Sequence, residues 1–268
     1  MTLARFPLNP DYGQGRYRRL LRFYALPGAV LATVDDSHHA MWVLLRHDGH
    51  RIEAVEADIS RGPATSCPGS AAGLRKLVGL DIHSSSHAAI ASLDRVANCT
   101  HLSDLAAWSL RVARHEQPGS RHEYQIRVED DNDSPFQIEI AKDGKSIHQW
   151  LVSGTTIIAP EPLADLPLMR GFMTRARTHF QGDELEAAIM LQRGIWVARG
   201  RRHIVDAAPV PLTFYEDMED ACYSYAGERR RTATSHVGYV RDVTDRVRPH
   251  PLPGRISRLL TGYDHEQC

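Results

Sequence analysis

The sequence contains no apolar run long enough to cross a bilayer, and its first eleven residues lack the apolar centre of a signal peptide. We therefore expect a cytoplasmic protein without a membrane partner. Charge of neither sign dominates, because the formal net charge is −1 and the basic run at 229–231 lies close to acidic residues. Nucleic-acid binding usually needs a broad basic face, so we expect no nucleic-acid partner.

Cysteine is scarce, and the four cysteines show no paired spacing such as C-x-x-C, which argues against a disulfide framework. Nucleotide and cofactor fingerprints are missing as well. The chain has no G-x-G-x-x-G after a strand, no G-x-x-x-x-G-K-[ST], no H-E-x-x-H and no G-x-S-x-G. We therefore expect no nicotinamide, flavin or nucleoside triphosphate chemistry, and no cofactor.

The composition is that of an ordinary globular protein, with 42% hydrophobic and 24% charged residues in a chain of 268. This length suffices for one large domain or two small ones. We expect a single domain over 1–268, with two halves, 1–118 and 119–268, as the alternative division. The turn-forming residues at 118–120 are the best internal boundary. The oligomeric state stays open, with a homodimer among the alternatives.

Runs of strand-like residues come first in each half, and helical patterns follow them. Asp48-Gly49 and Asp143-Gly144 are hairpin signals, which favours antiparallel pairing. Residues 16–24 fit either a strand or a short helix. Strands are predicted at 29–35, 40–47, 51–59, 123–129, 136–141 and 145–152, and helices at 71–78, 87–96, 102–115, 166–180 and 183–199. The order strands-helices-strands-helices predicts an α+β fold with mainly antiparallel sheet, not alternating βαβ units.

The segment 97–105 is a loop that becomes a helix, and it places Cys99 and His101 where free backbone N–H groups gather. A thiol at this position loses its proton more easily, and an anionic ligand can be held there. The alternative is that Cys99 is a small buried hydrophobic residue, which is the commoner role of a single cysteine at a helix start.

A metal site is a further alternative for the same segment. Cys67, Cys99 and His101 could supply three zinc ligands, and a metal-dependent hydrolase would follow. The long gap between the two cysteines makes this signal weak, and Pro68 gives Cys67 a plain role in a loop. We therefore assign no metal.

His148 and the pair His38 and His39 each allow more than one interpretation. His148 and Trp150 lie on one face of a predicted strand, where they could line an aromatic-binding pocket. A hydrogen-bonded histidine under a helix is equally compatible with this pattern. Of His38 and His39, which precede another strand, one should face the core and the other water. A pair without chemistry is the favoured interpretation there.

The stretch 214–225 is dense in aromatic and acidic residues. A helical spacing would put Tyr225 on one face with other apolar residues and Tyr223 on a second face. Tyrosine hydroxyls can transfer protons or hold a phenolic oxygen, although core packing is the commoner role of such a stripe. Arg175 and Arg177 lie on a predicted helix, where one cation turned inward could serve a phenolate or carboxylate.

Several short motifs resemble one known bacterial family. They are Tyr17-Arg18-Arg19, the strand end at 53–57, Cys67-Pro68, the segment 77–80 and Cys99-Thr100-His101-Leu102, with a looser match at 237–242. In these motifs, which span roughly residues 16–105, the chain resembles the family catalogued as domain of unknown function 2889.

The resemblance implies a role in the breakdown of lignin-derived aromatics. Some similar enzymes act as γ-formaldehyde lyases on phenylcoumaran dimers, so we expect a cofactor-independent carbon–carbon lyase that releases formaldehyde and leaves a stilbene. The alternative is a non-catalytic protein that binds small aromatic molecules. For the lyase, the candidate base is His101 or His148, the candidate acid is Tyr223 or Tyr225, and the candidate substrate-binding residues are Cys67, Cys99, Trp150, Arg175 and Arg177.

Overall fold

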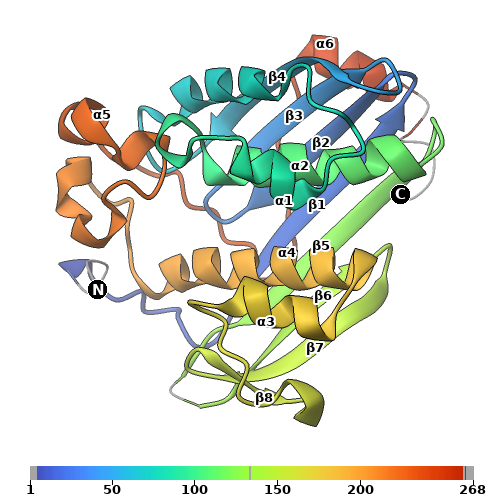
Figure 1. Cartoon of the computed structure of the whole chain (residues 1–268). Coiled ribbons are helices and arrows are strands. Elements are labelled where there is room, and N and C mark those ends of the chain that lie inside the picture. The colour runs from blue at the N-terminus through green and yellow to red at the C-terminus, as the bar shows by residue number, and fades with distance from the viewer. Residues whose placement is uncertain (1–4, 133, 262, 264–268) are drawn as a thin grey trace.

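One antiparallel sheet of eight strands runs through both halves of the chain, in the order β4-β3-β2-β1-β5-β6-β7-β8. The computed structural model describes residues 5–132, 134–261 and 263. The strands are β1 (Arg16–Leu26), β2 (Ala29–Asp36), β3 (Ala40–His47), β4 (Ile52–Arg61), β5 (Arg121–Glu129), β6 (Phe136–Lys142), β7 (Lys145–Ser153) and β8 (Thr156–Ala159). Figure 1 shows the sheet with its main helices on one face.

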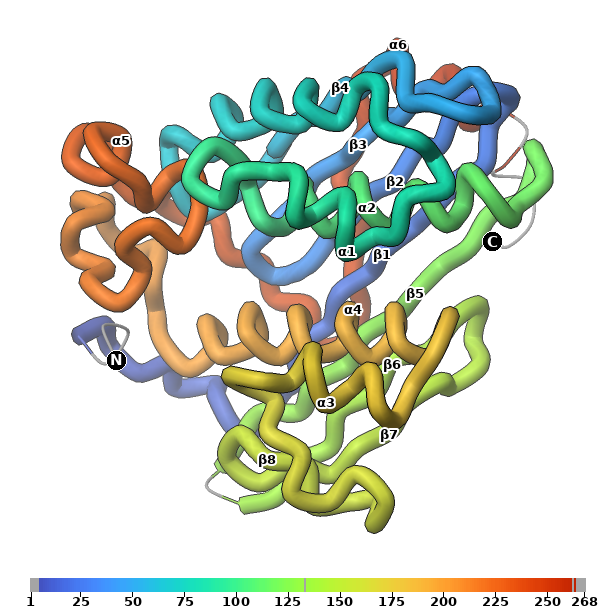
Figure 2. The backbone as a smooth tube through the Cα atoms, in the orientation of Figure 1, coloured from blue at the N-terminus to red at the C-terminus, as the bar shows by residue number. Residues whose placement is uncertain are grey.

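The two halves meet where β1 pairs antiparallel with β5. In each half a meander of four strands precedes a long helix, α2 (Thr100–His115) in the first half and α4 (Gly182–Ala198) in the second. Helix α2 packs on β1, β2 and β3, and α4 packs on β1, β5, β6 and β7. Both helices therefore cover the same face of one continuous sheet (Figures 1 and 2).

Strand β1 shows why the sheet has two different faces. Tyr17, Leu21 and Phe23 point to the helix side and join the main apolar core, because side chains alternate along a strand. The opposite face is covered over β1–β3 by the C-terminal segment, where Ile256 of α6 (Gly254–Ser257) packs in an apolar cluster with Leu31 and other residues. All of β2 is consequently buried.

The predicted α+β fold is confirmed, with the six predicted strands in place and the open segment 16–24 forming β1. The helix predicted at 166–180 begins later than expected, since α3 comprises Phe172–His179. Pro167 lacks the N–H that a helix needs and instead lies in a bridge with Thr156, and Gly171 has φ +87°.

Two other predicted helices are shorter or of another type. The segment 87–96 stops early, since α1 comprises Ser86–Ala91, and 71–78 falls in a 3-10 helix, η2 (Cys67–Leu77). The stretch 214–225 forms short 3-10 turns instead of one helix, so its tyrosines share no helical face. Asp220 interrupts it with φ +54°. A last short helix, α5, comprises Gly227–Thr232. In the described ranges no helix is long and apolar enough to span a membrane.

Candidate functional site

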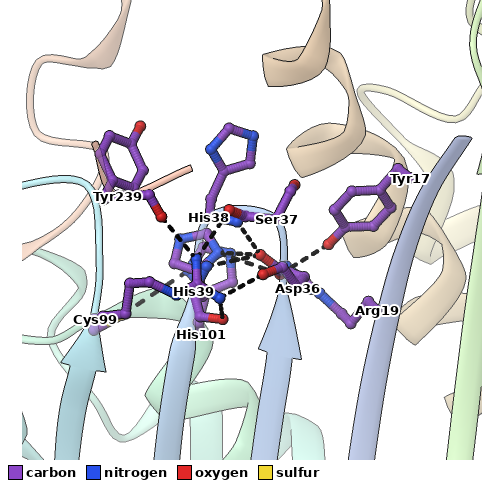
Figure 3. A network of polar contacts seen from close by, with 10 residues as sticks. Tyr17, Arg19, Asp36, Ser37, His38, His39, Cys99, His101 and Tyr239 are labelled. Carbon is purple, nitrogen blue, oxygen red and sulfur yellow. Dashed lines mark hydrogen bonds and ion pairs between the residues drawn. The ribbon is translucent and has the colours of Figure 1, made fainter. Parts of the chain in front are cut away.

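A buried carboxylate, Asp36, organises the polar cluster at the end of β2 (Figure 3). One of its oxygens accepts from the Tyr17 hydroxyl and from Arg19 Nε, each at 2.8 Å. The other accepts from the backbone N–H groups of His38 and His39, at 2.7 and 2.8 Å. Burial raises the pKa of this carboxyl, but the charges and hydrogen bonds of His39 and Arg19 outweigh it and hold the pKa well below its usual range. Asp36 is therefore ionised.

The carboxylate orients the imidazole of His39. His39 Nδ1 lies 3.1 Å from Asp36 Oδ1, and because an ionised carboxylate only accepts, Nδ1 donates to it. The ring of His39 lies against that of His101 at the start of α2, with centroids 4.3 Å apart and the rings tilted by 39°. Asp36, His39 and His101 thus form a continuous row of polar groups.

His101 is the outermost member of this row. Its side chain is partly exposed, whereas His39 is 5% exposed. Burial, together with the neighbouring His39 and the cations Arg19 and Arg193, lowers the pKa of His101 well below its usual value. A histidine that stays neutral at working pH can accept a proton, so His101 has the protonation state of a general base.

Cys99 stands before His101 as the N-cap of α2, but without a side-chain cap hydrogen bond. Its Sγ lies 4.0 Å from His101 Nδ1. Burial raises the thiol pKa, and the nearby Cys67 adds to this effect. The expectation that the helix start would favour a thiolate is therefore wrong, since loss of solvation outweighs the helix dipole. Cys99 is a neutral, buried side chain.

Arg61, from the end of β4, holds the turn that carries the catalytic candidates. Its guanidinium donates to the backbone carbonyls of Asp36 and His39 at 2.6 and 2.8 Å, and also to those of Ser37 and Tyr239. The carbonyls of His39 and Ser37 also accept from the backbone N–H groups of Asp36 and Arg241, at 3.0 and 2.8 Å. Arg61 thereby fixes the turn between β2 and β3 in the conformation in which the backbone N–H groups of His38 and His39 point at the Asp36 carboxylate.

The second histidine of the turn, His38, is also buried, so the expectation that one of the pair faces water is wrong. Burial lowers the pKa of His38 to about 3, and the ring is neutral. Its Nε2 has no hydrogen-bond partner among the described residues. The ring lies 5.8 Å from that of Tyr239 and packs against Gly200, where a Cβ atom would be 2.7 Å from Nε2.

A group of tyrosines and cysteines borders the cluster. Tyr225 lies near Cys67 and Tyr239, and these neighbours together with burial raise its pKa well above the usual value. Burial likewise raises the pKa of Tyr239, which also feels the charge of Asp36. Both phenols are therefore protonated at neutral pH. The Ser224 hydroxyl donates to Cys67 Sγ at 3.4 Å.

Helix α4 closes the site from the other half of the sheet. Arg193 of α4 lies 3.1 Å from Asp104 of α2, and Arg111 of α2 pairs with Glu186 of α4 at 3.8 Å. These two pairs mean that the helices run antiparallel. The same register brings Trp196, one turn beyond Arg193 and 43% exposed, to the end of α2 at which His101 lies. The start of α2 and the end of α4 both lie on the left side of Figure 1.

Of the residues proposed from sequence, the structure brings together Cys67, Cys99, His101 and Tyr225. Tyr223 is next to this group and stacks under Arg229, whose Cζ lies 4.0 Å from the ring centroid. Three cavities of the described residues lie around the segment 240–251. Neither Cys99 nor His101 lines any of these three.

The remaining candidates lie in the other half. His148 Nε2 donates to the carbonyl of Glu184 at 2.7 Å, which is the alternative of a hydrogen-bonded histidine under a helix. Trp150 is 1% exposed in the core. Arg175 and Arg177 are exposed on α3 and turn away from the core, because Phe172 and Ala176 occupy its inner face.

Sequence reasoning missed Asp36, Arg61 and the place of His39 in the polar cluster. The sequence did mark some residues that contact this cluster, since Tyr17-Arg18-Arg19 and Tyr239 belong to the motifs that carried the family resemblance. Cys67, Cys99 and His101 do not assemble as a metal site. Within the described ranges no group of three or more His, Cys, Asp or Glu side chains could hold a metal ion.

Comparison with known protein families supports part of this resemblance. The model of a family described as "Protein of unknown function (DUF2889)" matches residues 26–115. This stretch contains Asp36, His39, Arg61, Cys99 and His101, and it supports the resemblance found in the sequence motifs. No curated protein matches the chain. The chain is thus an α+β protein whose first half, with most of the polar cluster, resembles this family.

Proposed function

We propose that this protein is a cofactor-independent lyase that releases formaldehyde from a lignin-derived phenolic dimer of the phenylcoumaran type and leaves a stilbene. The observation that carries the proposal is the row Asp36–His39–His101, in which an ionised buried carboxylate orients one imidazole against a second, neutral one. Such a row suits general-base catalysis by the outer histidine.

The chemistry requires proton transfers but no redox equivalent. Ionisation of a 4-hydroxyphenyl group pushes electrons through the ring, breaks the bond to the ring-fused ether oxygen and leaves a quinone methide. Removal of the hydroxyl proton from the neighbouring CH2OH group then breaks the bond to the hydroxymethyl carbon. Its electron pair forms the stilbene double bond and restores the phenolate, and the carbon leaves as formaldehyde. The expelled ether oxygen takes up a proton.

Residues of the cluster match these tasks. His101 is the proposed base for the hydroxymethyl proton, and the Asp36 carboxylate, whose charge raises the pKa of His101 against the cations around it, stabilises the positive charge that His101 gains. Arg19 and Arg193, whose charges already act on His101, would stabilise a phenolate placed beside it. Tyr225, a buried neutral phenol, is the proposed acid for the departing ether oxygen.

These assignments favour one set of the sequence candidates over the other. His148, Arg175 and Arg177 lie in the second half and share no contact with His101 among the described residues. We therefore assign the base to His101 and the stabilising cations to Arg19 and Arg193.

The test incubates the purified protein with a phenylcoumaran and without added cofactor, and follows stilbene absorbance and formaldehyde together. Equal amounts of both products are expected from the wild-type protein. His101→Ala should lose activity roughly a hundredfold to ten-thousandfold, which is the usual effect of removing a general acid or base. His179→Ala, at an exposed position on α3, is the matched control and should retain full activity.

Two outcomes would contradict the lyase. If neither product appears while the substrate stays intact, the protein is no lyase of this substrate. If the substrate also raises the melting temperature without being consumed, the non-catalytic aromatic-binding protein is the better account.

A further inference from the structure

Two arginines oppose each other on the sheet face that α2 and α4 leave free. In the antiparallel pair of β1 and β5, Arg18 lies directly across from Arg127. Both side chains point away from α2 and α4, since their neighbours Tyr17 and Val128 point toward the core. Like charges directly opposite on a sheet destabilise the pairing. Such an arrangement needs a compensating anion or a functional reason.

Neither guanidinium is fully neutralised within the protein. Arg18 donates from Nε to the carbonyl of Thr244 at 2.9 Å, and it forms no ion pair with any described residue. Burial and the neighbouring cations Arg127 and Arg16 lower its pKa, and the charge of Asp245 opposes them without reversing the shift. Arg127 reaches Glu139 at 3.3 Å, but its Nε is buried without a hydrogen-bond partner among the described residues.

A cavity of about 240 Å³ lies over this pair. Its roof is the C-terminal segment, which runs behind the sheet in Figures 1 and 2 and contributes Asp245 and Arg246. Apart from Arg19, which is engaged by Asp36, the charged lining residues are Arg18, Arg22, Arg127, Arg246, Glu123 and Asp245. Cations exceed carboxylates by two, and the pair of Arg22 with Glu123 at 2.9 Å leaves the excess on the other arginines.

A second cavity, of about 470 Å³, shares residues 245–247 with the first one as part of its lining. Both cations and carboxylates line this second cavity, among them Arg61, Arg241, Arg248, Asp36, Asp242 and Asp245. The excess of cations is therefore a property of the first cavity, whose volume of about 240 Å³ admits a small organic anion and not only an inorganic ion.

We propose that Arg18 and Arg127, with Arg246 above them, bind the oxyanion group, carboxylate or phosphate, of a small molecule in this cavity. Guanidinium groups present planar pairs of N–H donors that match both kinds of oxyanion. An anion between the two arginines would offset their repulsion and give the buried Arg127 Nε an acceptor. This site lies on the opposite face of the sheet from His101 and does not depend on the proposed lyase activity.

Calorimetric titration of the full chain in a chloride buffer tests the site, with inorganic phosphate and succinate as probes and added chloride at equal ionic strength as the control. Saturable binding of at least one probe is expected. Arg18→Gln and Arg127→Gln should each weaken it at least about tenfold, as loss of a charge-assisted hydrogen bond does. Arg75→Gln, an exposed arginine in η2, should leave binding unchanged. Phosphate binding alone would indicate a phosphate ester as the natural ligand, and succinate binding alone a carboxylate.

Thermal unfolding gives a second readout that folding defects cannot mimic. Without the probes, Arg127→Gln should melt at a higher temperature than the wild type, because the like-charge pair is gone. With the probes, the wild type should gain more stability than Arg127→Gln at the same probe concentration. The proposal is overturned if neither probe binds the wild type, or if the double variant Arg18→Gln/Arg127→Gln binds as tightly as the wild type.

Discussion

The imidazole rings of His39 and His101 lie with their centroids 4.3 Å apart, although 62 positions separate the two residues in the chain (101 minus 39). His39 comes from the turn between β2 and β3, and His101 from the first turn of α2. Packing of α2 across the sheet is what brings them together. The two imidazoles have different surroundings, because His39, and not His101, is hydrogen-bonded to the Asp36 carboxylate.

The pH dependence of activity should reflect the lowered pKa of His101. Since its pKa lies well below 6.5, the neutral base form persists as pH falls, and the acid limb of kcat/KM should lie below pH 6.5. Arg193→Gln removes one of the cations that lower this pKa, so the acid limb should move to higher pH. Rates of formaldehyde release across pH measure both effects. An acid limb at or above pH 6.5 that Arg193→Gln does not move would exclude His101 as the base.

Replacing Asp36 should strongly destabilise the protein. Asp36→Asn leaves Arg19, 3% exposed, as an uncompensated buried charge. Breaking one partner of a buried ion pair costs about 3–5 kcal/mol in unfolding free energy. Urea unfolding measures the loss, and Asp11→Asn at an exposed position should stay within about 0.5 kcal/mol of the wild type. Equal stability of the two variants would mean that Asp36 and Arg19 are not coupled.

Gly200, in the 3-10 helix η5 (Arg199–Arg202) that follows α4, is needed where this helix meets the turn of His38. In Gly200→Ala the new Cβ would lie 2.7 Å from Nε2 and 3.0 Å from Cε1 of the buried His38 ring. Overpacking of this kind costs about 1–3 kcal/mol. Gly254→Ala is the matched control, because its nearest neighbour is the end of Arg258 at 4.0 Å and a loss of backbone entropy in the unfolded state should stabilise it slightly. Both are measured by urea unfolding. If Gly200→Ala is as stable as the wild type, His38 can move away at no cost.

Asp35, next to Asp36 on the other face of β2, should make the protein less stable as pH rises. Burial, opposed by the hydrogen bond from the His250 backbone N–H, raises its pKa to about 6. A carboxyl whose pKa is raised on folding is protonated in both states below about pH 4, and from there to pH 6 the folded state loses stability relative to the unfolded one. The loss approaches roughly 2–3 kcal/mol at pH 7.

The variant Asp35→Asn isolates this effect, because its amide oxygen can still accept from His250. Unfolding free energies of wild type and variant, measured from pH 4 to pH 7, should diverge in favour of the variant as pH rises. The charged neighbours Asp36, Arg61 and Arg22 are common to both proteins and cancel in the difference. Parallel curves would show that Asp35 has an ordinary pKa in the folded state.

The candidate site could be anticipated only in part, for reasons that particular residues make clear. His101 and Cys99 were identifiable because a helix start has a local signature of capping residues and apolar periodicity. The protonation state of Cys99 could not be identified from the sequence. The helix dipole acts locally, whereas the burial of the thiol near Cys67 depends on the tertiary structure. Asp36 accepts from the nearby backbone N–H groups of His38 and His39, but its side-chain partners Tyr17 and Arg19 lie on β1. Arg61 reaches the turn of Asp36 from the end of β4, and no local pattern records either contact.

The sequence by itself determined the alternation of strands and helices, including the two hairpins at Asp48-Gly49 and Asp143-Gly144, since these depend on side-chain period and turn chemistry over a few residues. Only the tertiary structure decided that β1 joins the halves into one sheet and that α2 and α4 lie antiparallel on it. The pairing of β1 with β5 put Arg18 opposite Arg127, and the packing of α2 on β2 and β3 put His101 beside His39. Contacts between residues far apart in sequence depend on how whole faces pack, and no local pattern records them.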